Sequence, residues 1–205
     1  MSYKHNNIRD AVLQVGSLHS MVATMNDELA RAREDLSPAR YEVIKAQKLE
    51  EFRNARSALN VSVLNLKRDL LASAEKQEAA MLLEHSKNPY IQLISSGAIL
   101  TADELANVLK QNPGNPLLLR SIETYATDRK LDNPNIKRAL QEEKAAQAPH
   151  ISRQQAIDTL ANYLTSYAPE ESTFENPGRH NHSYQMFTML NDGENKLFEK
   201  LDNSI

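Results

Sequence analysis

The feature that most constrains the fold is a heptad pattern of apolar residues between positions 8 and 70. These residues recur at alternating steps of three and four, which keeps their side chains on one side of an α-helix and is typical of coiled coils. The first series contains Ile8, Ala11, Val12, Val15, Leu18, Val22, Met25, Leu29, Ala32 and Leu36. The second contains Tyr41, Ile44, Lys48 or Leu49, Phe52, Ala55 or Arg56, Leu59, Val63, Leu66 and Leu70, and Arg56 is its one interruption. The pattern predicts two long amphipathic helices, each with an apolar seam.

Ser37 and Pro38 separate the two series. Proline lacks an N–H group and disfavours helical geometry in the residue before it, so the first helix must end here. Serine as a cap and proline at the first helical position then favour the start of the second helix. Because no helix-breaking residue occurs between Ala39 and Asn88, we expect a second helix of about 50 residues. At a rise of about 1.5 Å per residue it is roughly 75 Å long, and the first helix, of about 30 residues, is roughly 45 Å long. So short a turn predicts an antiparallel hairpin.

Short helices are predicted after residue 88. Five of the eight prolines follow an asparagine, whose side-chain oxygen can cap a helix while proline fits the first helical position. Each of these pairs is a candidate helix start or a turn: Asn88-Pro89, Asn112-Pro113, Asn115-Pro116, Asn133-Pro134 and Asn176-Pro177. Two capping boxes, from Thr101 to Glu104 and from Ser152 to Gln155, predict further helix starts.

We therefore expect an all-α protein, since no segment alternates apolar and polar residues as a strand would. A long antiparallel two-helix coiled-coil hairpin over residues 1–88 is expected to precede a compact bundle of short helices over residues 89–205. The best linker candidate lies near residues 148–151, at Ala148-Pro149. A loop is expected over residues 168–181, followed by a last helix that is interrupted near residues 192–193.

Composition and charge narrow the range of partners. The chain has 24 basic and 27 acidic residues and a net charge of −3, which disfavours nucleic acid and anionic membrane as partners. No apolar run approaches the length of about 18 residues that spans a membrane. Since the chain has no cysteine, it has no disulfide framework, and a cytoplasmic location is expected.

Few residues are candidates for chemistry. The sequence contains no HExxH, Walker A, GxGxxG or EF-hand pattern. His180 and His182 have ligand-like spacing, and Glu170, Glu171 and Glu175 are close in sequence. A zinc site needs three or four converging donors, whereas polar loops commonly collect histidine and glutamate, and we favour the second interpretation. We expect no catalytic residue, no cofactor and no metal; a metal-dependent enzyme is the least favoured alternative.

The hairpin points instead to a role in protein interaction. We expect the seam to mediate self-association or partner docking through Val15, Leu18, Val22, Met25, Leu29, Phe52, Leu59, Val63 and Leu66. A two-helix hairpin buries only one seam, so apolar residues off the seam are expected to form a second face that other helices cover. Those residues are Leu13, Met21, Val43, Val61 and Leu64.

A segment in the middle of the chain resembles a known class of proteins. Residues 100–126, LTADELANVLKQNPGNPLLLRSIETYA, are similar to helical segments of small scaffolding or capsid-accessory proteins from phages of Gram-positive bacteria. The resemblance implies a role in virion assembly, with the capsid protein as partner and the host cytoplasm or the virion as location. It assigns no functional residues. The alternative is a bacterial regulatory or adaptor module that binds another coiled-coil protein.

Overall fold

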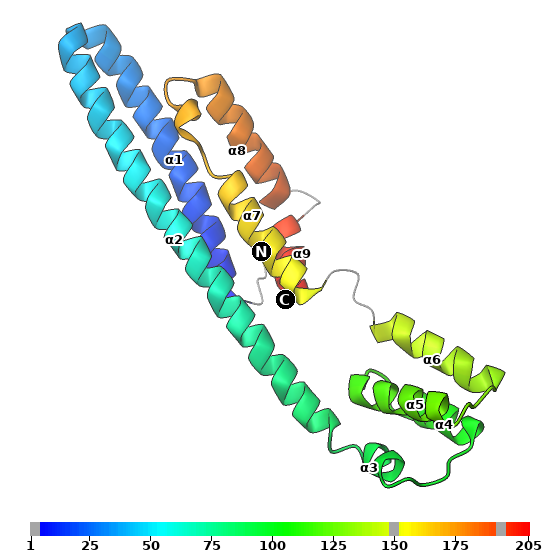
Figure 1. Ribbon diagram of the computed structural model, residues 1–205. Coiled ribbons are helices and arrows are strands. Elements are labelled where there is room, and N and C mark those ends of the chain that lie inside the picture. The colour runs from blue at the N-terminus through cyan, green and yellow to red at the C-terminus, as the bar shows by residue number, and fades with distance from the viewer. Residues whose placement is uncertain (1–4, 148–151, 192–195) are drawn as a thin grey trace. The chain divides into compact units, whose positions relative to one another are not determined.

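The computed structural model describes residues 5–147, 152–191 and 196–205, and over these residues it is helical without strands (Figure 1). The α-helices are α1 (Asn6–Asp35), α2 (Pro38–His85), α3 (Pro89–Ser95), α4 (Ala102–Gln111), α5 (Pro116–Asp128), α6 (Pro134–Gln147), α7 (Arg153–Ser166), α8 (Pro177–Asn191) and α9 (Leu197–Ser204), and η1 (Glu171–Thr173) is a short 3-10 helix. The predicted fold class, a long hairpin followed by shorter helices, is confirmed.

The hairpin has the predicted unequal helices. α1 contains 30 residues and α2 contains 48, and the chain reverses between them at Leu36 and Ser37. The Leu36 N–H donates to Ala32 O and closes the last turn of α1. The Tyr41 N–H donates to Ser37 O and begins α2. The serine–proline pair therefore ends one helix and starts the next, as the sequence predicts.

Asparagine–proline pairs and capping boxes begin the shorter helices, also as predicted. Asn88 and Asn115 accept backbone N–H groups at the starts of α3 and α5 through their side-chain oxygens. Both capping boxes are complete, at Thr101 before α4 and at Ser152 before α7. The loop expected over residues 168–181 ends earlier, because α8 begins at Pro177. Residues 192–193, where an interruption was expected, lie outside the described residues.

The chain divides into two units, and the division differs from the expected boundary at residue 88. Unit 1 comprises residues 1–72 and 151–205, and unit 2 comprises residues 73–150, so the first boundary falls inside α2. The C-terminal helices thus belong with the hairpin instead of with α3 to α6. The linker candidate at residues 148–151 lies outside the described residues.

A second seam on α1 explains why the C-terminal helices pack on the hairpin. Ile8, Val15, Val22 and Leu29 alternate with Ala11, Leu18 and Met25 in one heptad series. They alternate with Val12, His19 and Asn26 in a second series. All of these residues are buried. Helices α7, α8 and α9 contact α1, and α7 and α8 run alongside it in Figure 1. The hairpin therefore has one side covered by its own C-terminal segment, defined here as the described residues after 151.

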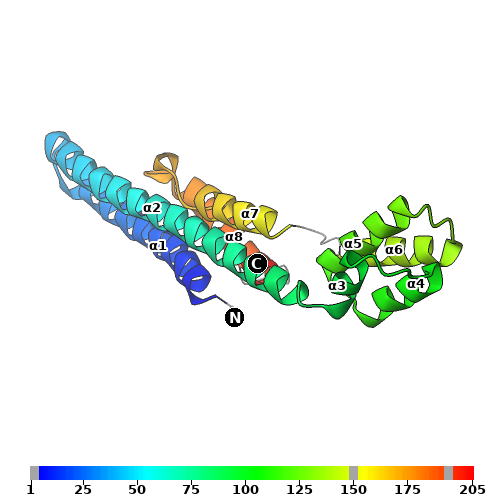
Figure 2. The ribbon, with the colours of Figure 1, turned by 60° about the horizontal axis from the view of Figure 1, so that its bottom comes forward.

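Unit 2 has its own hydrophobic core, and Figure 2 shows α3 to α6 gathered together. Its buried residues are Leu105, Ala106, Val108, Leu109, Leu118, Leu119, Ile122, Tyr125, Ile136 and Ala139. The Tyr125 hydroxyl donates to Ala98 O at 3.0 Å and accepts from Leu100 N at 2.9 Å. This side chain therefore holds the loop between α3 and α4 against α5.

We expect Tyr125→Phe to lower the free energy of unfolding of unit 2 by about 1–2 kcal/mol, because both backbone groups lose their partner. Amide hydrogen exchange in α4 and α5 measures the change. The same substitution at Tyr184, which is 44% exposed in unit 1, serves as the control. Equal exchange in the two variants would show that the hydroxyl contributes nothing to unit 2.

Candidate functional site

The seam residues predicted to bind a partner are buried inside unit 1. Their exposed fractions lie between 0% for Val15, Val22 and Phe52 and 8% for Leu66. The full set is Val15, Leu18, Val22, Met25, Leu29, Phe52, Leu59, Val63 and Leu66. Because α2 covers one side of α1 and the C-terminal segment covers another, these residues form the core. The prediction that they offer a docking surface is corrected accordingly.

The two metal-ligand candidates do not share a site. Both lie on α8 instead of in the predicted loop. His180 is buried, and its Nε2 lies 3.0 Å from His19 O, whereas His182 is exposed. The neighbouring carboxylates are paired with cations, Glu171 with Arg53 and Glu175 with Lys45. Among the described residues, no group of three or more His, Cys, Asp or Glu side chains is placed to hold a metal.

A buried histidine that the sequence interpretation missed connects α1 to the C-terminal segment. His19 Nε2 lies 2.8 Å from Tyr167 O, and because a carbonyl oxygen only accepts, Nε2 carries the proton. Its Nδ1 is buried and finds no hydrogen-bond partner among the described residues. The rings of His180, Tyr184 and Phe187 surround it, with centroids 5.3–5.6 Å away. His19 is thus held as a neutral donor.

The environment of His19 changes its acidity. Burial lowers the pKa of His19 below its ordinary value of 6.5, the hydrogen bond to the Tyr167 carbonyl raises this pKa, and the nearby His180 lowers it. Burial is the largest of these causes, because a charged imidazolium loses its hydration there. The surroundings of His19 therefore favour the neutral form of its imidazole over the charged form.

Two further polar side chains of the hairpin bind the segment that follows α7. Asn26 donates to Thr173 O at 3.1 Å and accepts from Glu175 N at 2.9 Å. Arg56 donates to Ala168 O at 2.9 Å and also to the carbonyls of Thr165 and Pro169. The charged interruption of the second seam thus binds the carbonyl groups at the C-terminal end of α7, where a cation is favoured.

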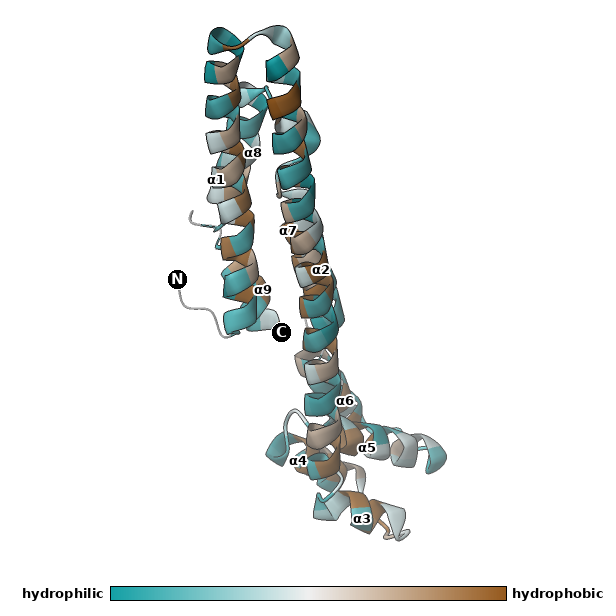
Figure 3. Ribbon diagram, turned by 90° about the vertical axis from the view of Figure 1, so that its left-hand side faces the viewer, coloured by the Kyte–Doolittle hydropathy of each residue, from teal (hydrophilic) through white to brown (hydrophobic). Residues whose placement is uncertain are grey.

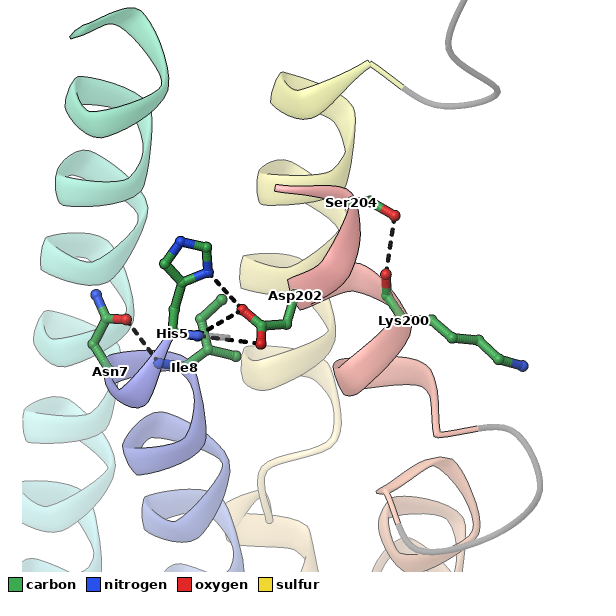
Figure 4. A network of polar contacts seen from close by, with 6 residues as sticks. All are labelled: His5, Asn7, Ile8, Lys200, Asp202 and Ser204. Atoms are coloured by element: carbon green, nitrogen blue, oxygen red, sulfur yellow. Dashed lines mark hydrogen bonds and ion pairs between the residues drawn. The ribbon is translucent and has the colours of Figure 1, made fainter. Parts of the chain in front are cut away.

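The first residues of α1 are held by the last helix of the chain. His5 N donates to both carboxylate oxygens of Asp202 at 3.2 Å, and His5 Nδ1 lies 2.6 Å from Oδ1 (Figure 4). Asp202 is fully buried on α9. The first turn of α1 has no acidic residue, and the His5 side chain does not cap it. The Asp202 carboxylate therefore supplies the negative charge that a helix N-terminus favours.

We expect Asp202→Ala to lower the free energy of unfolding of unit 1 by about 1–3 kcal/mol, because the His5 N–H loses its acceptor. Thermal unfolding and amide exchange in the first turn of α1 measure the loss. Asp10→Ala is the matched control, since this carboxylate lies nearby on α1 but is exposed and, among the residues that the structure describes, is paired only with Arg9. An equal loss in both variants would argue against the cap.

The surface of the hairpin that the C-terminal segment leaves uncovered carries exposed apolar side chains among polar ones. We call this surface the outer face and define it by Leu13, Ser17, Met21, Val43, Ala58, Val61 and Leu64. Between α1 and α2 it contains a groove of about 320 Å³ lined by Gln14, Ser17, Leu18, Met21, Ala55, Ala58, Leu59 and Ser62. Figure 3 views the hairpin with α7 and α8 behind it, and hydrophobic segments recur along both helices.

The residues predicted to lie off the seam occupy the exposed side of the hairpin. The exposed fractions are 60% for Leu13, 58% for Val43, 55% for Val61 and 66% for Leu64. Met21 is partly buried and lines the groove. The C-terminal segment therefore leaves these side chains uncovered. They are the strongest candidates for contact with another chain.

Comparison with known proteins found no relative of this chain. No protein-family model, no curated protein and no solved structure matches the chain. None of the helices in the described part of the chain is long and apolar enough to cross a membrane.

Proposed function

We propose that this protein is a non-enzymatic structural protein that binds other protein chains through the outer face of its hairpin. The observation that supports the proposal is the exposure of large aliphatic side chains at Leu13, Val43, Val61 and Leu64, each more than half exposed. Single exposed leucines are ordinary on protein surfaces, but several on one pair of helices favour a binding surface.

The arrangement of buried polar groups agrees with a structural role. His19, Asn26 and Arg56 each bond backbone atoms of the C-terminal segment. These contacts hold the C-terminal segment on one side of the hairpin. The other side stays free to bind a partner. The role of these three side chains is to form hydrogen bonds that stabilise packing.

Virion assembly is the biological setting that the resemblance of residues 100–126 favours, with the capsid protein as partner. In unit 2 these residues form α4 and α5 together with their caps and much of the core. In this proposal the outer face of the hairpin, and not the resembling segment, recognises the capsid protein. A regulatory or adaptor role would use the same outer face with a different partner.

Cross-linking in the cells that produce the protein, followed by mass spectrometry, tests the proposal. We expect cross-links from α1 and α2 to identified protein chains, and we expect Val61→Glu to remove them. Ile99→Glu is the control, because Ile99 is 85% exposed but lies in unit 2. The proposal fails if both variants keep the same cross-links, or if cross-links arise only from unit 2.

A further inference from the structure

Helix α8 is held on the hairpin by few buried side chains. Of its 15 described residues, only His180 and Phe187 are buried. Both lie against the same residue of α1, because their ring centroids are 5.6 and 5.3 Å from that of His19. The neighbouring helix α7 instead buries four apolar residues, namely Ala156, Ile157, Leu160 and Leu164. The attachment of α8 to α1 therefore centres on the rings around His19.

The two histidines of this cluster each use Nε2 to bind a backbone carbonyl. His19 Nε2 donates to Tyr167 O at 2.8 Å, and His180 Nε2 donates to His19 O at 3.0 Å. Because Nε2 carries the proton in each neutral ring, a further proton must bind at Nδ1. His19 Nδ1 is buried and has no hydrogen-bond partner among the described residues. A proton at this atom creates a donor without an acceptor and a charge without hydration.

The surroundings of His19 do not balance such a charge. The ring faces His180 and Tyr184 from α8 and the Tyr167 carbonyl from the end of α7, and no carboxylate in the described part of the chain forms an ion pair with either histidine. The acidic residues just before α8 pair with cations instead: Glu170 with Arg179, Glu171 with Arg53 and Glu175 with Lys45. Aromatic faces attract a cation, but burial is the larger effect, since it is the main cause that lowers the pKa of His19.

We propose that α8 is an acid-sensitive strap, which covers α1 while His19 is neutral and leaves α1 when His19 is protonated. This conformational switch goes beyond the proposed function and does not depend on it, because α8 lies on the side of the hairpin that the C-terminal segment covers. Release uncovers α1 around Gly16 and His19, since a Cβ atom at Gly16 would lie only 3.7 Å from Phe187 Cε1.

The rest of the C-terminal segment has contacts that mild acid does not weaken. On α9, Asp202 binds His5 at the start of α1, and protonation of His5 turns this contact into a pair of opposite charges (Figure 4). Asn26 does not titrate, and it keeps its hydrogen bonds to Thr173 O and Glu175 N just before α8. The buried residues of α7 are all apolar. The opening is therefore confined to α8.

Amide hydrogen exchange of the full-length protein tests the switch at about one pH unit above and below 6.5, the ordinary pKa of histidine. Protection factors are compared, because they correct for the direct effect of pH on exchange. We expect the protection of α8 to fall about tenfold from the higher to the lower pH, as the binding of one proton allows, while α7 and α9 keep theirs. His19→Gln can donate to Tyr167 O but cannot titrate, so its α8 should stay protected at both values. His182→Gln, on the exposed side of α8, should behave like the wild type.

Three results overturn the switch: unchanged protection of α8 in the wild type, an equal loss in His19→Gln, or an equal loss in α7 and α9, which would mean that the whole segment opens. If His19→Gln does not fold, an NMR titration of the His19 ring in the wild type decides. We expect His19 to take up its proton over the same pH range in which α8 loses protection. A protonated His19 beneath a protected α8 would contradict the proposal.

Discussion

Replacing Phe52 with alanine is expected to lower the free energy of unfolding of unit 1 by about 3–5 kcal/mol. Phe52 on α2 is fully buried, and its ring lies 5.1 Å from that of Phe174, which follows η1. The substitution removes a large apolar side chain and leaves a cavity between the hairpin and the C-terminal segment. Chemical denaturation followed by circular dichroism measures the loss.

Amide hydrogen exchange assigns this loss to the contact between hairpin and segment. We expect faster exchange in α7, η1 and α8, and unchanged exchange in α4 and α5 of unit 2. Leu64→Ala on the same helix is the control, since Leu64 is 66% exposed and its truncation leaves no cavity. Unchanged exchange in α7 and α8 of the Phe52→Ala variant would mean that the segment does not share a core with the hairpin.

Acidification below pH 6.5 is expected to destabilise unit 1 through His19. Burial holds the pKa of His19 below 6.5 in the folded protein. At a pH between the folded and the unfolded pKa, His19 therefore binds a proton in the unfolded chain but not in the folded chain. The stability contributed by neutral His19 is complete above pH 6.5 and is lost as the pH falls from 6.5 toward the folded pKa. One such group changes the free energy of unfolding by at most about 1.4 kcal/mol per pH unit.

His19→Gln isolates this effect. A glutamine amide can donate to Tyr167 O but does not titrate, so we expect denaturant unfolding of this variant to depend less on pH between 5 and 7, about the range in which histidine titrates. His180 and Tyr184 on α8 face the same ring and remain in the variant. His182→Gln is the control, because His182 is exposed on the same helix. A pH dependence that survives His19→Gln unchanged would exclude His19 as its source.

The features governed by local chemistry could be predicted from the sequence. The lengths of α1 and α2 follow from a seam without helix breakers, and Ser37 and Pro38 locate the turn. The starts of α4 and α7 follow from the side chains of Thr101 and Ser152. In each case the decisive residues lie within a few positions of the feature, so no knowledge of distant packing was needed.

The packing of the C-terminal segment could not be predicted in the same way. His19 follows the seam residue Val15 by four positions, and Asn26 follows Val22 by four. Because both residues are polar, a search for apolar periodicity does not include them. Their partners, such as Tyr167 and Thr173, are backbone carbonyls more than a hundred residues away. Polar residues at heptad spacing were the one available signal of a second seam, because polar residues that become buried need partners.

The candidate site was also only partly predictable. The exposed positions Leu13, Val61 and Leu64 could be identified because they lie off the seam. The residues on the seam itself were assigned to partner binding, since the sequence does not say that the same chain covers them. Which side of the hairpin stays open depends on α7 and α8, and hence on long-range contacts.

Carbene footprinting of the wild-type protein tests the central claim, that the outer face of the hairpin binds protein, most directly. The labelling of individual side chains is compared between the dissociated and the assembled protein. The account predicts that Leu13, Val61 and Leu64 lose reactivity on assembly, while Ile99 of unit 2 and Met189 on α8, which are 85% and 60% exposed, stay reactive. Assembly that protects Ile99 or Met189 and leaves the three outer-face residues fully labelled would contradict it.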